Sequence, residues 1–255
     1  RGSEALAAHD SEFLGLFLGL LPVETSMGRM SFGEIRTRFD GKIWFAPTVD
    51  VFRQIAQVAS AQGIGVINAG YSYDADLLAR ASEVYEGLDV RSVDAADLTS
   101  ALDEVRDPAR YEELLAVAAR TLAPYRCDVS LKRFDPAEMP VLYASGEDVA
   151  FQRAIEQSQK ADSEDGLWAT MLEKVSEPTQ DAKASLVFNA ANPLVGRLAR
   201  TADEDALRLT TQMLYVQALL LGHHPLRPEE MSLLSVGLID LIEWGLGRDE
   251  GPTLQ

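Results

Sequence analysis

The chain has 255 residues, of which 47% are hydrophobic and 25% are charged, as in an ordinary globular protein of one large or two modest domains. Forty acidic against 23 basic side chains give a net charge of −17. This charge repels phosphate groups and anionic lipids, so we expect neither nucleic acid nor a membrane surface as a partner. The single cysteine, Cys127, excludes an internal disulfide and a cysteine-based zinc site, and it suits a reducing compartment.

The first forty residues predict helix and turn. Residues 4–21 read as a helix, and residues 23–31 read as a turn. Ser31 and Glu34 have the spacing of a capping box for a short helix. The longest apolar run, Phe13 to Leu21, is far shorter than the ~20 residues that a bilayer requires, and acidic residues precede it. We therefore expect a buried helix there, and neither a membrane span nor a signal peptide.

The next part of the chain alternates between strand and helix. Strands are predicted at 42–46, 64–68 and 90–93, and helices at 49–61 and 73–86. Parallel strands need helical crossovers, so this order predicts a small parallel α/β unit.

The rest of the chain predicts a mixed α+β domain. Helices are expected at 108–122, over most of 147–182, just after Asn192-Pro193, and at 203–221 and 228–247; strands are expected at 128–134, 140–144 and 184–188. The fold class is therefore a small parallel α/β unit followed by an α+β domain that ends in a two-helix hairpin.

Each of the last two helices carries two apolar stripes. The first stripe is Ala206, Leu209, Met213, Val216 and Leu220 on one helix and Met231, Leu234, Leu238 and Leu241 on the other; the second is Leu214, Ala218, Leu221, Val236, Ile239, Ile242 and Leu246. This spacing predicts an antiparallel pair with heptad-type packing. Since two stripes exceed what one partner helix covers, either both helices lie deep in a core or they form a four-helix bundle with a second subunit. We favour the bundle.

The sequence shows no catalytic, cofactor or metal constellation. Gly63 and Gly65 flank the end of a helix and the start of a strand, which is the wrong order for a dinucleotide fingerprint. His223 and His224 are adjacent and would point apart on a regular element. Acidic pairs such as Glu229 and Glu230 are too common among 40 acids to indicate catalysis.

The order of pieces resembles the C-terminal half of the heat-shock protein 90 chaperone family, of the bacterial HtpG type. Residues 42–99, from KIWFAPTVD to RSVDAADLT, look like the small α/β unit that ends the family's middle domain. Two strands around Asp135-Pro136-Ala137, a long helical segment, a strand and Asn192-Pro193-Leu194-Val195 follow the order of its C-terminal domain. The final LYVQALLLGHHPLRPEEMSLLSVGLIDLIEW is similar to its dimerisation helices.

This resemblance implies a fragment of a cytoplasmic, stress-induced bacterial chaperone. Residues 4–40 would be a helical linker of the middle domain, residues 41–105 its small α/β unit, and residues 106–250 the C-terminal dimerisation domain. The expected dimer interface comprises Leu209, Met213, Val216, Leu220, Met231, Leu234, Leu238, Leu241 and Ile242. ATP and Mg²⁺ would belong only to the N-terminal domain, so we expect no enzymatic activity and no cofactor in this chain. The chain opens on Arg1 without an initiator Met, and we expect it to be part of a longer protein.

The helical segment 147–182 is the expected binding surface for unfolded client proteins. Its candidate residues, spaced as on helix faces, are Phe151, Ile155, Leu167, Trp168, Met171 and Leu172. The alternative is that Trp168 packs on the adjacent sheet as a core residue.

Two other classes of function remain open. The α/β unit would be a small-molecule enzyme site if a polar pocket existed near Asn68, Gly70 and Tyr71, at the carboxyl ends of its strands. The chain would instead be a dimeric effector domain of a regulator if a basic DNA-reading segment preceded it.

Overall fold

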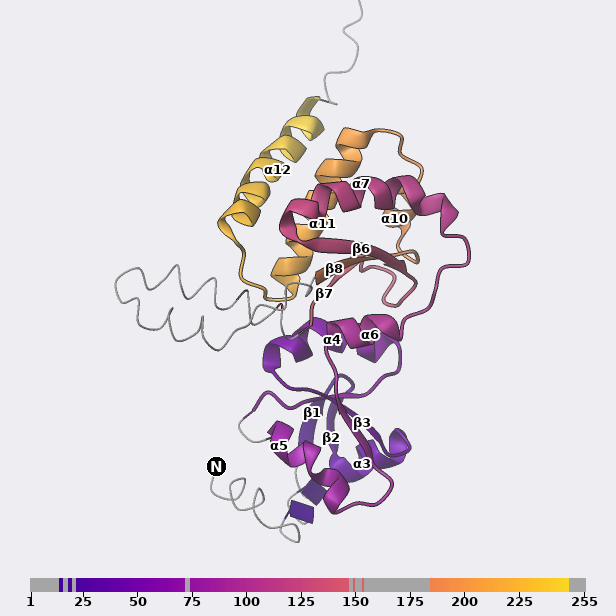
Figure 1. The fold of residues 1–255 in the computed structure, drawn as a ribbon, viewed down its shortest axis with the longest axis vertical. Helices are drawn as coiled ribbons and strands as arrows, with labels where there is room; N and C mark the ends of the chain where they lie inside the picture. Colours follow the sequence, from indigo (N-terminus) through magenta and orange to yellow (C-terminus); the bar gives the residue numbers. More distant parts are fainter. Residues whose placement is uncertain are drawn as a thin grey trace, which may run out of the picture. The chain divides into compact units, whose positions relative to one another are not determined.

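The computed structural model of the protein describes residues 14, 15, 18, 19, 22–71, 74–146, 149, 153 and 184–247. The chain divides into two compact units (Figure 1). Residues 1–103 and 134–138 belong to the first, and residues 104–133 and 139–255 to the second. The mixed α and β architecture confirms the expected fold class, and the division at 103/104 lies two residues before the expected boundary.

The first unit is built on a five-stranded sheet with the order β2-β1-β4-β3-β5. Its strands are β1 (Pro22–Thr25), β2 (Gly28–Ser31), β3 (Lys42–Ala46), β4 (Val66–Asn68) and β5 (Asp89–Ser92). The central strand β3 pairs in parallel with both β4 and β5. This parallel core is the α/β unit that the sequence predicts.

Capping side chains mark the starts of helices in the first unit. They are α3 (Phe32–Arg38), α4 (Val49–Ala61), α5 (Asp74–Ala79), the 3₁₀ turn η1 (Ala81–Glu83) and α6 (Ala95–Ser100). The capping box of Ser31 and Glu34 starts α3 as predicted. Thr48 caps α4 by accepting a hydrogen bond from the Val51 N–H at 3.2 Å. After α4, Gly63 adopts a φ of +74°, which favours glycine.

The predicted turn at 23–31 is wrong, because these residues form a β-hairpin. Strands β1 and β2 are antiparallel, with Thr25 opposite Gly28, and β1 pairs with β4. Ser26 secures this position, since its hydroxyl donates to the Ile64 carbonyl at 2.8 Å and accepts from the Val66 N–H at 3.0 Å. Residues 22–40 are therefore part of the first unit's sheet and helices, and not a separate helical linker.

The second unit packs helices onto a three-stranded sheet with the order β6-β8-β7. Strands β6 (Cys127–Lys132) and β8 (Ala184–Asn189) are parallel, and β7 (Val141–Ala144) is antiparallel to β8. The helices are α7 (Glu112–Leu122), α10 (Pro193–Leu198), α11 (Glu204–Leu221) and α12 (Pro228–Gly247), with 3₁₀ turns η2 (Ala109–Tyr111) and η3 (Ala123–Tyr125). Helices α7 and α11 pack against each other over the sheet, and α12 lies along α11 (Figure 1).

Two asparagines shape the turn between β8 and α10. Asn189 is fully buried, donates to the Met139 carbonyl at 3.0 Å and accepts from the Ala191 N–H at 3.0 Å. Asn192 caps α10 by accepting from the Leu194 N–H at 2.8 Å, and Pro193 occupies the first turn. The Asn-Pro motif that contributes to the family resemblance thus has a structural role here.

Candidate functional site

The hairpin of α11 and α12 is held together by a close contact at Gly237. A Cβ atom added to this glycine would lie 2.1 Å from Met213 Cε and 3.6 Å from Leu209 Cδ1. The absent side chain therefore lets the two helices approach. Leu234 is also partly buried and packs against the core of the second unit. Of the predicted interface residues, Leu209 and Met213 therefore lie between the helices of one chain, and Leu234 packs against the core of that chain.

One predicted interface residue belongs to the core instead. Val216 is fully buried and packs with Leu214, Tyr215 and Leu219 on the inner face of α11. The prediction that Val216 lies at a dimer interface is therefore wrong. The 3-4 spacing of apolar residues identifies a helix face that packs, but it does not distinguish the face toward the core from the face toward solvent.

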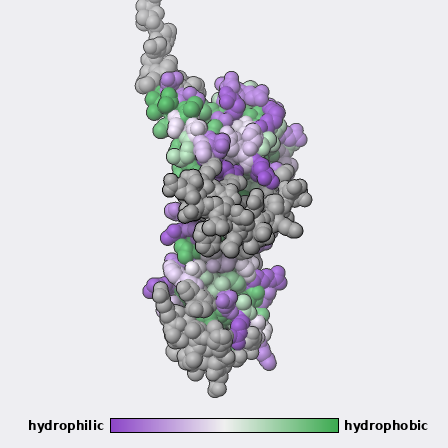
Figure 2. All heavy atoms as spheres, turned by 60° about the vertical axis from the view of Figure 1, so that its left-hand side comes forward, coloured by the Kyte–Doolittle hydropathy of each residue, from purple (hydrophilic) through white to green (hydrophobic). Residues whose placement is uncertain are grey.

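The outer face of the hairpin is apolar and exposed (Figure 2). The predicted residues Leu220, Met231, Leu238 and Ile242 are 47 to 53% exposed; Leu221, Val236 and Ile239, which belong to the second stripe, are also exposed. We call these seven residues the hairpin surface. The side chain of Leu241 lies outside the described part of the structure. Helix α12 is thus not enclosed in a core, which excludes the first of the two arrangements considered for the helix pair.

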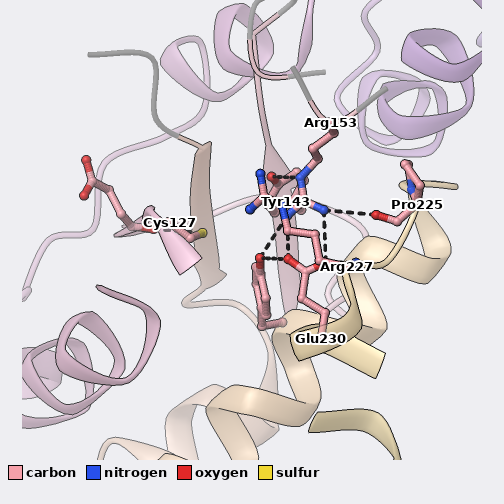
Figure 3. Close-up of polar contacts among 8 residues, drawn as sticks. Cys127, Tyr143, Arg153, Pro225, Arg227 and Glu230 are labelled. Atoms are coloured by element: carbon pink, nitrogen blue, oxygen red, sulfur yellow. Dashed lines mark hydrogen bonds and ion pairs between the residues drawn. The ribbon is translucent and has the colours of Figure 1, made fainter. Parts of the chain in front are cut away.

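A buried ion pair lies at the base of the same hairpin (Figure 3). Arg153 and Glu230 have side chains that are 2% and 0% exposed, with 2.7 Å between Arg153 Nη2 and Glu230 Oε1. A second bond joins Arg153 Nη1 to Glu230 Oε2 at 3.1 Å. Two parallel bonds of this kind are the strongest way for a guanidinium to hold a carboxylate. Glu230 lies in the first turn of α12 and Arg153 lies between β7 and β8 in sequence.

Neighbouring groups complete the hydrogen bonding of this pair. The Tyr215 hydroxyl donates to Glu230 Oε1 at 2.6 Å, and the Arg227 N–H donates to Glu230 Oε2 at 2.8 Å. The Arg153 guanidinium donates to the hydroxyl oxygens of Tyr143 and Tyr215 at 3.2 and 3.0 Å, and to the Pro225 carbonyl at 3.1 Å. Both charges are therefore surrounded by partners, which a buried ion pair requires.

The charge states of the pair follow from these contacts. Burial alone would raise the pKa of Glu230, but the hydrogen bonds from Arg153, Tyr215 and the Arg227 backbone outweigh it and lower this pKa. Burial acts to lower the pKa of Arg153, and the hydrogen bond to Glu230 reverses the direction and raises it. Burial raises the pKa of Tyr143 to about 12. Glu230 is thus an anion, and Arg153 a cation, at neutral pH.

Sequence reasoning missed this pair. In the sequence, Glu230 is one of 40 acids, and its only distinction is that it stands three residues after Arg227, whose N–H donates to it as to a capping glutamate. That spacing is the one local signal for its role. Arg153 gives no comparable signal, because its partner is 77 residues away in the chain.

The strand ends of the first unit are closed by protein groups. The Asn68 side-chain amide donates to Glu24 at 2.8 Å, and its oxygen accepts from the Gly70 N–H at 3.1 Å. A Cβ atom at Gly70 would lie 2.2 Å from the Val49 nitrogen, so the loop lies directly against the start of α4. Tyr71 is 57% exposed beside Glu24. This arrangement gives no support to a small-molecule site at Asn68, Gly70 and Tyr71.

The remaining candidates lack the features of a reactive site. Burial raises the pKa of the Cys127 thiol to about 12, so it is not a nucleophile at neutral pH. Within the described ranges, no group of three His, Cys, Asp or Glu side chains could hold a metal ion, and no helix is long and apolar enough to cross a membrane. The six client-binding candidates, Phe151, Ile155, Leu167, Trp168, Met171 and Leu172, lie outside the described residues.

Comparison of the sequence with protein families and with curated proteins finds no match in either case.

Proposed function

We propose that this chain is the C-terminal part of an ATP-dependent molecular chaperone of the heat-shock protein 90 type, and that it joins two copies of the parent protein. The observation that carries this proposal is the hairpin surface. Of the eight large hydrophobic side chains that are exposed among the described residues, seven belong to this surface. An apolar patch of this kind, on a chain with a net charge of −17, is typical of a site for protein association.

A second copy of the chain is the occupant that fits this surface. A two-helix hairpin with an apolar outer face can pair with an identical hairpin across a two-fold axis and form a four-helix bundle. Helix α12 contains no lysine or arginine, so the contact would be driven by apolar burial and not by charge pairing. The order of elements along the chain, which resembles that of the family's dimerisation domain, supports the same partner.

The remaining parts of the proposal follow from the resemblance. The parent protein would hydrolyse ATP in an N-terminal domain, with Mg²⁺, while this chain would need no cofactor and catalyse no reaction. Unfolded client proteins would bind to the 147–182 segment. The cell compartment would be the cytoplasm, and the parent would act as a heat-shock protein in a bacterium.

Sedimentation velocity tests the proposal directly. We expect a dimer at micromolar concentration. Leu238→Asp with Ile242→Asp places two carboxylates per chain on α12, at side chains that are each 53% exposed. Complete burial of one such side chain is worth about 1.5–3 kcal/mol. About half of each side chain is exposed in the single chain and would be buried by the dimer. Losing this burial at four positions, two in each chain, weakens the dimer by roughly 3–6 kcal/mol, or at least a hundredfold.

The control adds the same charge elsewhere. Gln57→Asp with Ser60→Asp introduces two carboxylates at exposed positions of α4, in the first unit. This variant should dimerise as the unmodified chain does. An unmodified chain that sediments as a monomer at tens of micromolar would refute the proposal.

A further inference from the structure

Glu230 of the buried pair directly precedes Met231 of the hairpin surface, and the inference drawn from the pair rests on the proposed dimer. We propose that Arg153 is the positioning residue of α12. It fixes the first turn of this helix through Glu230, so that burial of the Arg153 side chain and formation of the dimer are coupled.

The geometry explains why an arginine is needed at this point. Its guanidinium donates to four separate pieces of the second unit, as Figure 3 shows. These are Tyr143 on β7, Tyr215 on α11, Pro225 in the connection between the last two helices, and Glu230 on α12. A lysine has three donors on a single nitrogen and cannot reach all of these acceptors. Arg153 therefore joins the sheet and both helices of the hairpin.

Loss of Arg153 would displace α12. Glu230 has no exposed surface, and a buried carboxylate without its cation is strongly unfavourable. The least costly response is a movement of the first turn of α12 that lets water reach Glu230. Met231 follows Glu230 directly, and Leu238 lies two turns further along the same helix. A shift of this turn therefore moves the surface that the dimer requires.

Coupling of this kind is reciprocal. If the pair forms only when α12 is in the position that dimerises, then the dimer also stabilises Arg153 in its buried place, by the same factor. Val149, which is 9% exposed, also packs in the core of the second unit. Dimer formation should consequently protect the amides of Val149 and Arg153 from hydrogen exchange.

The test compares Arg153→Met with Arg153→Met/Glu230→Met. At about pH 7.5 the single variant should dimerise at least tenfold more weakly, because it leaves Glu230 buried and unpaired. The double variant should recover to within about threefold, because a buried ion pair can be replaced by apolar side chains. Arg153→Lys keeps a cation next to Glu230 and should show a smaller loss in the same direction. If Arg153→Met does not fold, Arg153→Lys takes its place in the comparison with the double variant.

A pH profile separates positioning from simple packing. In Arg153→Met, the arginine no longer offsets the effect of burial, so the pKa of Glu230 rises from the lowered value that it has in the unmodified chain. The dimer of this variant should therefore tighten as the pH falls and Glu230 becomes neutral, and it should do so at a higher pH than that at which Glu230 titrates in the unmodified chain. Among the described residues, the other charged or titratable groups around this carboxylate are Tyr125, Tyr143, Tyr215 and Cys127, with Glu229 next to it in sequence and His224 against the Tyr143 ring. The double variant retains all of them, so the difference between the two profiles isolates Glu230.

The outcomes distinguish this inference from the proposed function. A monomeric unmodified chain refutes the dimer, and hydrogen exchange on that monomer then tests the positioning role alone. Arg153→Met should increase exchange at the amides of residues 229–233 at least tenfold. Unchanged exchange there, or a single variant that dimerises with unchanged affinity and no pH dependence, overturns the role of Arg153.

Discussion

Replacing Gly70 with alanine should destabilise the first unit strongly, although the change adds one methyl group. The new Cβ atom would lie 2.2 Å from the Val49 nitrogen, 2.7 Å from the Thr48 carbonyl carbon and 2.7 Å from Val49 Cγ2. Two of these atoms are backbone at the start of α4, and backbone cannot rotate away as a side-chain end can. The loop or the start of the helix must therefore move.

The size of the effect follows from what this movement disturbs. Overpacking a tightly packed site costs about 1–3 kcal/mol. A shift at Thr48 also loosens its 3.2 Å bond to the Val51 N–H, and losing such a cap costs about 1 kcal/mol. The sum is roughly 2–4 kcal/mol. In a unit of this size, it corresponds to a melting temperature lower by roughly 10–25 °C.

Thermal unfolding followed by circular dichroism measures this change. Gly33→Ala is the matched control, because a Cβ atom at Gly33, in α3, meets nothing within 4 Å. That variant should be as stable as the unmodified chain or gain up to about 1 kcal/mol from helix propensity. If Gly70→Ala melts at the same temperature as Gly33→Ala, the loop does not lie against the helix start, and space for a ligand at the strand ends would have to be reconsidered.

Two further predictions concern the second unit. Cys127 should not react with a thiol reagent at about pH 8 in the folded protein, because burial raises the pKa of its thiol to about 12. It should react fully in denaturant, and rapid labelling under native conditions would contradict this prediction. Asn192→Ala should lower the free energy of unfolding in urea by about 1 kcal/mol through loss of the α10 cap, whereas Asn192→Asp should retain most of that stability. Equal stability of the two variants would show that the cap contributes nothing.

The elements that were predicted well are those in which local pattern and tertiary environment agree. Strand Lys42–Ala46 and helices Val49–Ala61 and Pro228–Gly247 have the predicted bounds. Their strand and helix signals coincide with a buried strand, a capped amphipathic helix and a helix that begins at a proline. The hairpin of β1 and β2 was missed because its strands are short, half of their residues are exposed, and their position depends on contacts with the distant Ile64 and Val66.

The candidate site was only half predictable for a related reason. Apolar spacing indicated that α11 and α12 pack on more than one side, and the structure exposes Leu238 and Ile242 accordingly. The same spacing could not assign Val216 to the core, because both faces of α11 are apolar. The pairing of Arg153 with Glu230 requires the folded arrangement of β7, α11 and α12, which no local pattern contains.

The buried ion pair of Arg153 and Glu230 is informative about the role of the hairpin. A buried pair is seldom more stabilising than apolar side chains of similar volume, so stability alone does not account for Arg153 and Glu230 beside a large apolar core. What the pair adds is a requirement for one arrangement, because displacing either side chain leaves a charge buried without its partner. Away from the close contact at Gly237, the Leu and Met side chains of the helix pair tolerate many contacts, so they fix the position of α12 on α11 less strictly. Holding α12 at its first turn restricts that freedom, as the proposed two-fold contact between copies would require.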